Sequence, residues 1–170
     1  MPLSGTLLAV SAFAEQSTTI DLGTSRAAQA LSRSMSLGSG TGAGKADRVF
    51  SDRRTLAASA TEDLDLAGSL VDAFGATITF ARIKGLVVAA AAGNTNNVVI
   101  GAASSNPWAT LLGATHTLTL RPGAFVAVGT GVADATGYAV TASTGDLLKV
   151  ANSGSGTSVT YDIHIIGASA

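Results

Sequence analysis

The chain lacks cysteine and has few charged or aromatic residues. Without cysteine, disulfide scaffolds, thiolate catalysis and cysteine-ligated zinc or iron–sulfur sites are excluded. Only 12% of the 170 residues are charged, about half of the usual 25% or so. Lys and Arg number 10, Asp and Glu number 11, and the formal net charge is -1. The positive surface that general nucleic-acid binding requires is missing, so we expect no nucleic-acid partner.

Long apolar runs are also missing. The longest, residues 85–93, is far shorter than the roughly 20 residues that cross a bilayer as a helix. Residues 7–14 end in Ala12-Phe13-Ala14, as at a signal-peptide cleavage site, but no Lys or Arg precedes Arg26 to form a basic n-region. We therefore expect no membrane partner and no signal peptide, although the mean hydropathy is +0.40.

Strand patterns prevail in what the chain does contain. Residues 77–90 begin with alternating apolar and polar side chains and end as a continuous apolar run, which indicates a strand entering a region covered on both faces. Arg121–Gly123 has proline and glycine at the positions of a type II turn. About seven to ten short strands, with turn signals roughly every 8 to 12 residues, predict an all-β fold, an antiparallel β-sandwich or jelly-roll-like domain.

The chain is expected to have two parts, an N-terminal arm with short strands at residues 1–39 and a β-sandwich domain at residues 40–170. Within the arm, the β-branched residues of 17–22 predict one short strand. Serine occupies every second position of residues 31–37, which favours another strand. A helix is the alternative for this second segment, because three larger residues lie four positions apart: Ala27, Leu31 and Met35.

A glycine-rich stretch, Gly38–Gly44, lies at the boundary and is followed by Lys45, as in a phosphate-binding P-loop. That signature requires Gly five residues before the Gly-Lys pair and Ser or Thr after it, but Ser39 and Ala46 occupy these positions. We expect a linker or an exposed hairpin loop here and no nucleotide site.

Candidate catalytic and metal-ligating residues are sparse. His116 and His164 have no second histidine or acidic residue at ligand spacing, and no Gly-x-Ser-x-Gly elbow is present. Glu62, Asp63 and Asp65 lack the pattern of a calcium loop. The water-facing side of a strand explains Asp63 and Asp65 better. We therefore expect no enzyme, no metal and no cofactor.

Three residues are candidate partner contacts. Trp108, the only tryptophan, ends the loop of residues 104–108. Its simplest interpretation is a lid over one end of the core, and the functional alternative is an interface anchor, a role in which tryptophan is enriched. Asn96 and Asn97 lie in a turn cluster, residues 93–97, that tolerates left-handed backbone, and they complete the set.

Several segments carry a resemblance to a known group of proteins: residues 40–47, 54–60, 63–68, 78–84, 94–101, 121–123, 145–152 and 160–167. In these segments the chain resembles small virion structural proteins of tailed bacteriophages that are rich in Ala, Gly and Thr. The resemblance implies a place in the virion after assembly in the host cytoplasm. It implies no catalytic residues and no particular position in the particle.

The leading hypothesis is a capsid decoration (cement) or head-fibre protein that packs on the shell as a homo-oligomer, a trimer or another small assembly. Its partners would be copies of itself and the major capsid protein or other virion proteins. The scarcity of charge fits, since charged residues are depleted at interface cores. Residues 1–24 would add a strand to a neighbour's sheet. The alternatives are a tail, collar or baseplate component that contacts the host and, from another class, a carbohydrate-binding module.

Overall fold

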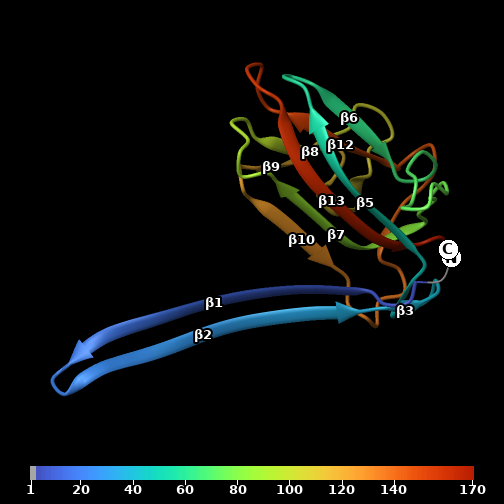
Figure 1. Ribbon diagram of the computed structural model, residues 1–170. Helices are drawn as coiled ribbons and strands as arrows, with labels where there is room; N and C mark the ends of the chain where they lie inside the picture. Colours follow the sequence, from blue (N-terminus) through green and yellow to red (C-terminus); the bar gives the residue numbers. More distant parts are fainter. Residues whose placement is uncertain (1–2) are drawn as a thin grey trace.

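The computed structural model describes residues 3–170, most of which lie in β-strands (Figure 1). The strands are β1 (Leu7–Ile20), β2 (Gly23–Ser36), β3 (Gly38–Ser39), β4 (Lys45–Ala46), β5 (Arg48–Leu56), β6 (Thr61–Asp65), β7 (Arg82–Ala90), β8 (Val98–Gly101), β9 (Thr117–Leu120), β10 (Phe125–Gly129), β11 (Tyr138–Ala139), β12 (Leu147–Asn152) and β13 (Val159–Ala168). A single described helix, α1 (Ala109–Leu112), precedes β9. The predicted all-β class is confirmed.

Two open antiparallel sheets form the body of the molecule. One has the strand order β10-β7-β13-β5, with β11 also paired to β7, and the other has the order β6-β12-β8-β9. A single hydrophobic core draws its side chains from both sheets, as in a β-sandwich. A jelly-roll arrangement stays a prediction.

The core follows the two-residue period of the strands. In β7 the side chains of Leu86, Val88 and Ala90 are buried in the core, and the residues between them, Val87 and Ala89, are only half-buried. The expected strand at residues 77–90 thus begins later, at Arg82. Apolar side chains before it are buried too, although they lie outside a named strand.

The N-terminal region forms a hairpin that projects from the body (Figure 1). Strands β1 and β2 pair over their whole length, from Leu7 opposite Ser36 to Ile20 opposite Gly23. These strands have 14 residues each and are longer than the short strands that we expected. The predicted strand at residues 17–22 is the end of β1 together with the turn at Asp21 and Leu22. The helical alternative for residues 27–35 is wrong.

Lys84 ties the glycine-rich stretch to the body. It lies at a register shift where Ile166 pairs with Gly85 and Gly167 pairs with Ile83. The buried Nζ of Lys84 donates to the carbonyl oxygens of Gly42 and Lys45, the latter at 2.7 Å. A P-loop presents backbone N–H groups to an anion, whereas here carbonyl oxygens converge on a cation.

We predict that Lys84→Met lowers the free energy of unfolding by about 1–3 kcal/mol, because two carbonyl groups lose their donor. Urea unfolding measures this loss, and amide hydrogen exchange should be faster at Gly38 and Gly40, whose N–H groups donate to the carbonyls of Gly44 and Ala46 on either side of Lys45. Lys45→Met, at an exposed side chain, is the matched control. Unchanged stability and exchange in Lys84→Met would contradict the prediction.

Candidate interaction surface

The β1–β2 hairpin has two faces of different character. Because residues directly opposite one another share a face, the register places Leu8 and Met35 on one face and Leu7 and Phe13 on the other. We call the face that carries Leu8 the inner face. Its described members are Leu8, Val10, Ala12, Ala14, Gln16, Thr18 and Ile20 from β1, and Gly23, Ser25, Ala27, Gln29, Leu31, Arg33 and Met35 from β2.

The base of the inner face packs on the body. A Cβ placed at Gly129 would lie 3.0 Å from Leu8 Cδ2, and one at Gly85 would lie 3.4 Å from Met35 Cε. Met35 is buried in a second apolar cluster with Ile166 and two other residues. Glycine at these two positions therefore allows the hairpin to pack closely against the sheet.

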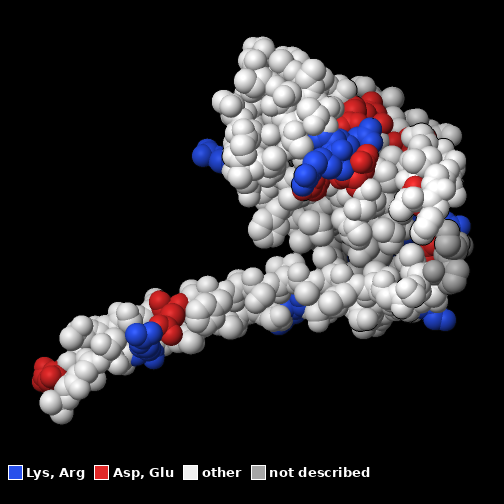
Figure 2. Space-filling model, viewed as in Figure 1, with Lys and Arg blue, Asp and Glu red and all other residues white. Residues whose placement is uncertain are grey.

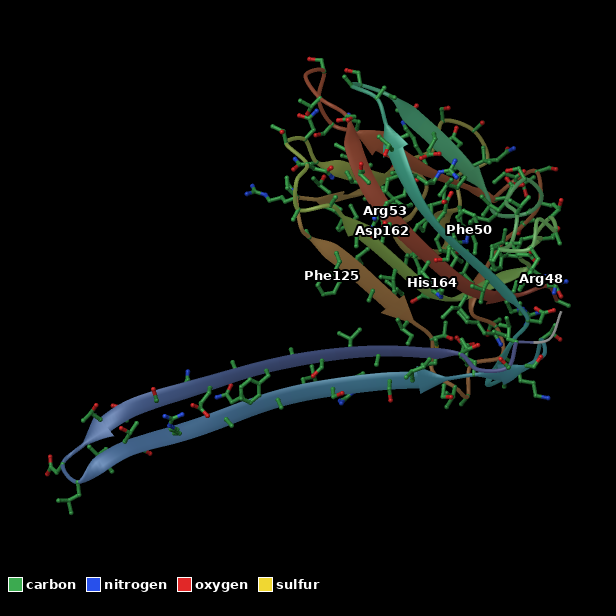
Figure 3. All side chains as sticks on the ribbon, viewed as in Figure 1. Arg48, Phe50, Arg53, Phe125, Asp162 and His164 are labelled. Atoms are coloured by element: carbon green, nitrogen blue, oxygen red, sulfur yellow. The ribbon has the colours of Figure 1, made fainter. Side chains whose placement is uncertain are left out.

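The contacted surface belongs to the side of the five-stranded sheet that points away from the core. We call it the outer face, and its central members are Ser51 and Arg53 from β5, Val87 and Ala89 from β7, Phe125 and Ala127 from β10, and Asp162 and His164 from β13. Figure 3 shows four of these side chains, Arg53, Phe125, Asp162 and His164, on this side of the sheet. The outer face is apolar along β7 and β10 and polar along β13 and β5.

The polar half of the outer face carries a two-pronged ion pair. Arg53 Nε and Nη2 donate to the carboxylate oxygens of Asp162 at 2.6 and 2.9 Å. This bond raises the pKa of Arg53 and lowers that of Asp162. A shallow hollow of about 570 Å³ runs beside the pair and is lined also by Val87, Ala89 and His164.

A deeper groove of about 690 Å³ lies at the root of the hairpin, between residues 3–7, β5 and the loop of residues 72–78. His164 lines this groove as well as the shallow hollow. Phe74, which is 76% exposed, stands at its margin. The outer face is thus hollowed from the hairpin root to the Arg53–Asp162 pair.

Beyond Leu8 and Met35, the hairpin runs away from the body (Figure 1). Val10, Ile20 and Leu31 on the inner face are 43, 55 and 57% exposed, and Phe125 on the outer face is 66% exposed. Figure 2 shows most of the hairpin as uncharged surface, with its charged residues in a few small groups. Both faces therefore carry exposed large apolar side chains beyond the root of the hairpin.

Trp108 closes one end of the core, as its simplest interpretation predicted. Its side chain is 5% exposed, its Nε1 donates to the carbonyl of Ala139 at 2.9 Å, and its ring meets that of Tyr138 edge to face at 6.3 Å. A contact between Trp108 and a partner stays a prediction.

The structure does not bring Trp108 together with the two asparagines. Asn96 Nδ2 donates to the carbonyl of Thr157, and the backbone N–H of Asn97 donates to Ser153 Oγ, both at 2.9 Å. These bonds lie just beyond the end of β12. The backbone N–H of Trp108, by contrast, donates to the carbonyl of Leu147, the first residue of β12. Asn96 and Asn97 therefore belong to the opposite end of the sandwich, and their role as partner contacts stays a prediction.

The carboxylate cluster is divided between two environments. Asp63 is exposed, as predicted, and Asp65 is half-buried. Glu62 instead accepts a hydrogen bond from the buried Tyr161 hydroxyl at 2.7 Å and pairs with Arg54 at 2.7 Å. Burial, and then the bond to Glu62, raises the pKa of Tyr161. Nothing in the sequence marked Glu62 as different from its neighbours.

Residues 3–170 contain no group of three or more His, Cys, Asp or Glu side chains placed to hold a metal ion. The helix in the described part of the chain is too short to cross a membrane. Comparison of the sequence with models of protein families and with curated proteins, and of the fold with solved structures, gave no match.

We predict that acidification destabilises the protein partly through His164. Burial of this half-buried side chain lowers its pKa, so below the ordinary histidine value of about 6.5 the unfolded chain binds the proton more readily than the folded chain. The free energy of unfolding should fall from pH 7 to pH 5 by more in the native chain than in His164→Gln. Denaturant unfolding at the two pH values tests this.

His116→Gln, at an exposed histidine, should keep the native pH dependence. Asp162 and Arg53 face His164 on the outer face and are present in both variants, so the difference between the variants isolates His164. Identical pH profiles for His164→Gln and the native chain would show that the prediction is wrong.

Proposed function

We propose that this protein is a structural subunit that works by packing against other molecules through its projecting hairpin. The observation that carries the proposal is that β1 and β2 contact almost only each other and expose large apolar side chains over most of their length. An isolated two-stranded hairpin is marginally stable in water at best. A ribbon of this length therefore requires a partner surface.

The chemistry of the hairpin fits burial in an assembly better than a dynamic binding loop. Its ion pair joins Arg26 and Glu15 at 2.9 Å across the two strands, so these charges largely neutralise each other. Most other side chains are Ala, Ser and Thr, and these lose little conformational entropy when they are buried. Covering this surface therefore costs little side-chain conformational entropy.

We further propose that the assembly is the virion of a tailed bacteriophage, with the protein as a capsid decoration or head-fibre protein. The resemblance noted in residues 40–169 supports the virion, and the scarcity of charge supports a surface covered by copies of itself or by the shell. A position in the tail, collar or baseplate is the alternative. Copy number separates the two positions, because a head lattice takes many copies and a tail takes few.

The test is binding to heads purified from a phage mutant that lacks this gene. We expect the added native chain to cosediment with these heads in many copies. A variant with residues 11–32 replaced by Asn-Gly should bind at least about tenfold more weakly, because it keeps the root contacts of Leu8 and Met35 but loses the exposed ribbon, a loss worth about 1.4 kcal/mol or more. Val71→Ser, which removes an exposed apolar side chain outside the hairpin, is the control.

Binding of only a few copies, located at the tail by electron microscopy, would replace the head position by the alternative. Full binding by the shortened variant would overturn the role of the hairpin. No binding to heads or tails at micromolar protein would overturn the virion assignment itself.

A further inference from the structure

We propose that the inner face of the hairpin docks on the outer face of the five-stranded sheet of a second copy of this chain. The inference deepens the proposed function by naming a partner for the hairpin. It is tested on purified protein without phage particles, so self-association and binding to heads can fail independently.

The first support is continuity with a contact that already exists within the chain. Leu8 and Met35 of the inner face pack on Gly85 and Gly129 of the outer face. The two surfaces therefore fit each other at the root, where both are covered. From there each continues as an uncovered surface of the same kind, through Val10 and Leu31 on the hairpin and through alternate residues of β7 and β10 on the sheet.

The second support is reach. A 14-residue strand extends about 46 Å at the usual rise of roughly 3.3 Å per residue, whereas the nine residues of β7 extend about 30 Å. Figure 1 shows the end of the hairpin well beyond the body. The chain therefore cannot cover the far half of its own hairpin, which leaves that half free to reach a second copy.

The third support is that the two surfaces match in shape and charge. We call the inner face of the hairpin the donor face and the outer face of the sheet the acceptor face. Ala12, Ala14 and Ala27 make the middle of the inner face shallow, which permits close approach to the side chains of β7 and β10. Both surfaces also carry little net charge. Arg33 is the only charged residue of the inner face, and Arg53 and Asp162 of the outer face pair with each other.

The fourth support is area. The sheet accepts about 30 Å of a ribbon that is about 10 Å wide, which is roughly 300 Å² on one face. In a symmetric pair each copy both donates a hairpin and accepts one, so each would bury roughly 600 Å². The total of about 1,200 Å² is the lower limit of the range for specific interfaces. One chain carries both halves of the contact, which is the requirement for association between identical copies.

Sedimentation velocity of the purified chain tests the proposal with one variant in each surface. Leu31→Asp places a charge in the donor face, and Phe125→Asp places one in the acceptor face. Phe13→Asp is the matched control, because Phe13 is 69% exposed at the same level of the hairpin but on the opposite face. We expect the native chain and Phe13→Asp to self-associate, and each of the other two variants to show a dissociation constant at least about tenfold higher.

Mixing the two defective variants provides a second measurement. Phe125→Asp keeps a native donor and Leu31→Asp keeps a native acceptor, so their mixture should form a heterodimer through one intact contact. Thermal unfolding monitored by circular dichroism shows whether each body remains folded. Both substitutions lie at exposed side chains outside the main core, so native-like unfolding is expected.

A monomeric native chain at the highest concentrations tested would overturn the proposal and assign the inner face to a different protein. The proposal would also be overturned if Phe125→Asp self-associated like the native chain while Leu31→Asp lost self-association. The hairpins would then pair with each other and not with the sheet. If Phe13→Asp alone lost self-association, the contact would lie on the hairpin face opposite the inner face, and this too would overturn the proposal.

Discussion

The packing of Leu8 and Met35 on two glycines of the five-stranded sheet determines how the rest of the molecule is presented. A Cβ at Gly85 or Gly129 would lie 3.0–3.4 Å from side-chain atoms of Leu8, Met35 or Ile166, so these side chains would have to shift to make room. Because Gly129 is the last residue of β10 and pairs with Gly85 at the end of the β7–β10 ladder, the hairpin leaves the body at the edge of the outer face and not across its middle. The contacts of Leu8 and Met35 therefore determine which part of the hairpin is left exposed.

Charge is scarce in the hairpin and in the body alike. Twenty-eight residues lie in the two hairpin strands, 14 in each, and three of them, Glu15, Arg26 and Arg33, are charged. This fraction is close to the 12% of the whole chain. Several of the charged side chains pair with one another, as Arg26 does with Glu15 on the hairpin and Arg53 with Asp162 on the body, and Figure 2 shows uncharged surface over most of both parts.

The sequence predicted the local features well and the long-range ones poorly. Alternation in residues 77–90 and the turn at Arg121–Gly123 predicted an all-β fold, because strand period and turn chemistry are properties of neighbouring residues. The burial of Trp108 agrees with its simplest interpretation, a lid over one end of the core. The hairpin was missed as a unit because both of its faces are exposed, so burial imposes no strong alternation on them. Glu62 and Lys84 were missed for a different reason: the partner of Glu62 is 99 positions away, and the burial of Lys84 depends on a register shift in β13.

The tether from Lys84 to the glycine-rich stretch has a mechanical consequence. The stretch begins two residues after β2 ends, so the bonds from Lys84 to the carbonyls of Gly42 and Lys45 hold the chain just after the ribbon ends, in addition to the glycine contacts of Leu8 and Met35. The seven residues Gly38–Gly44, which would otherwise be a flexible linker, are thereby attached to strand β7 of the body. Bending at the root of the hairpin would break contacts on two sides of the ribbon, so the chain favours the observed direction of the hairpin over others.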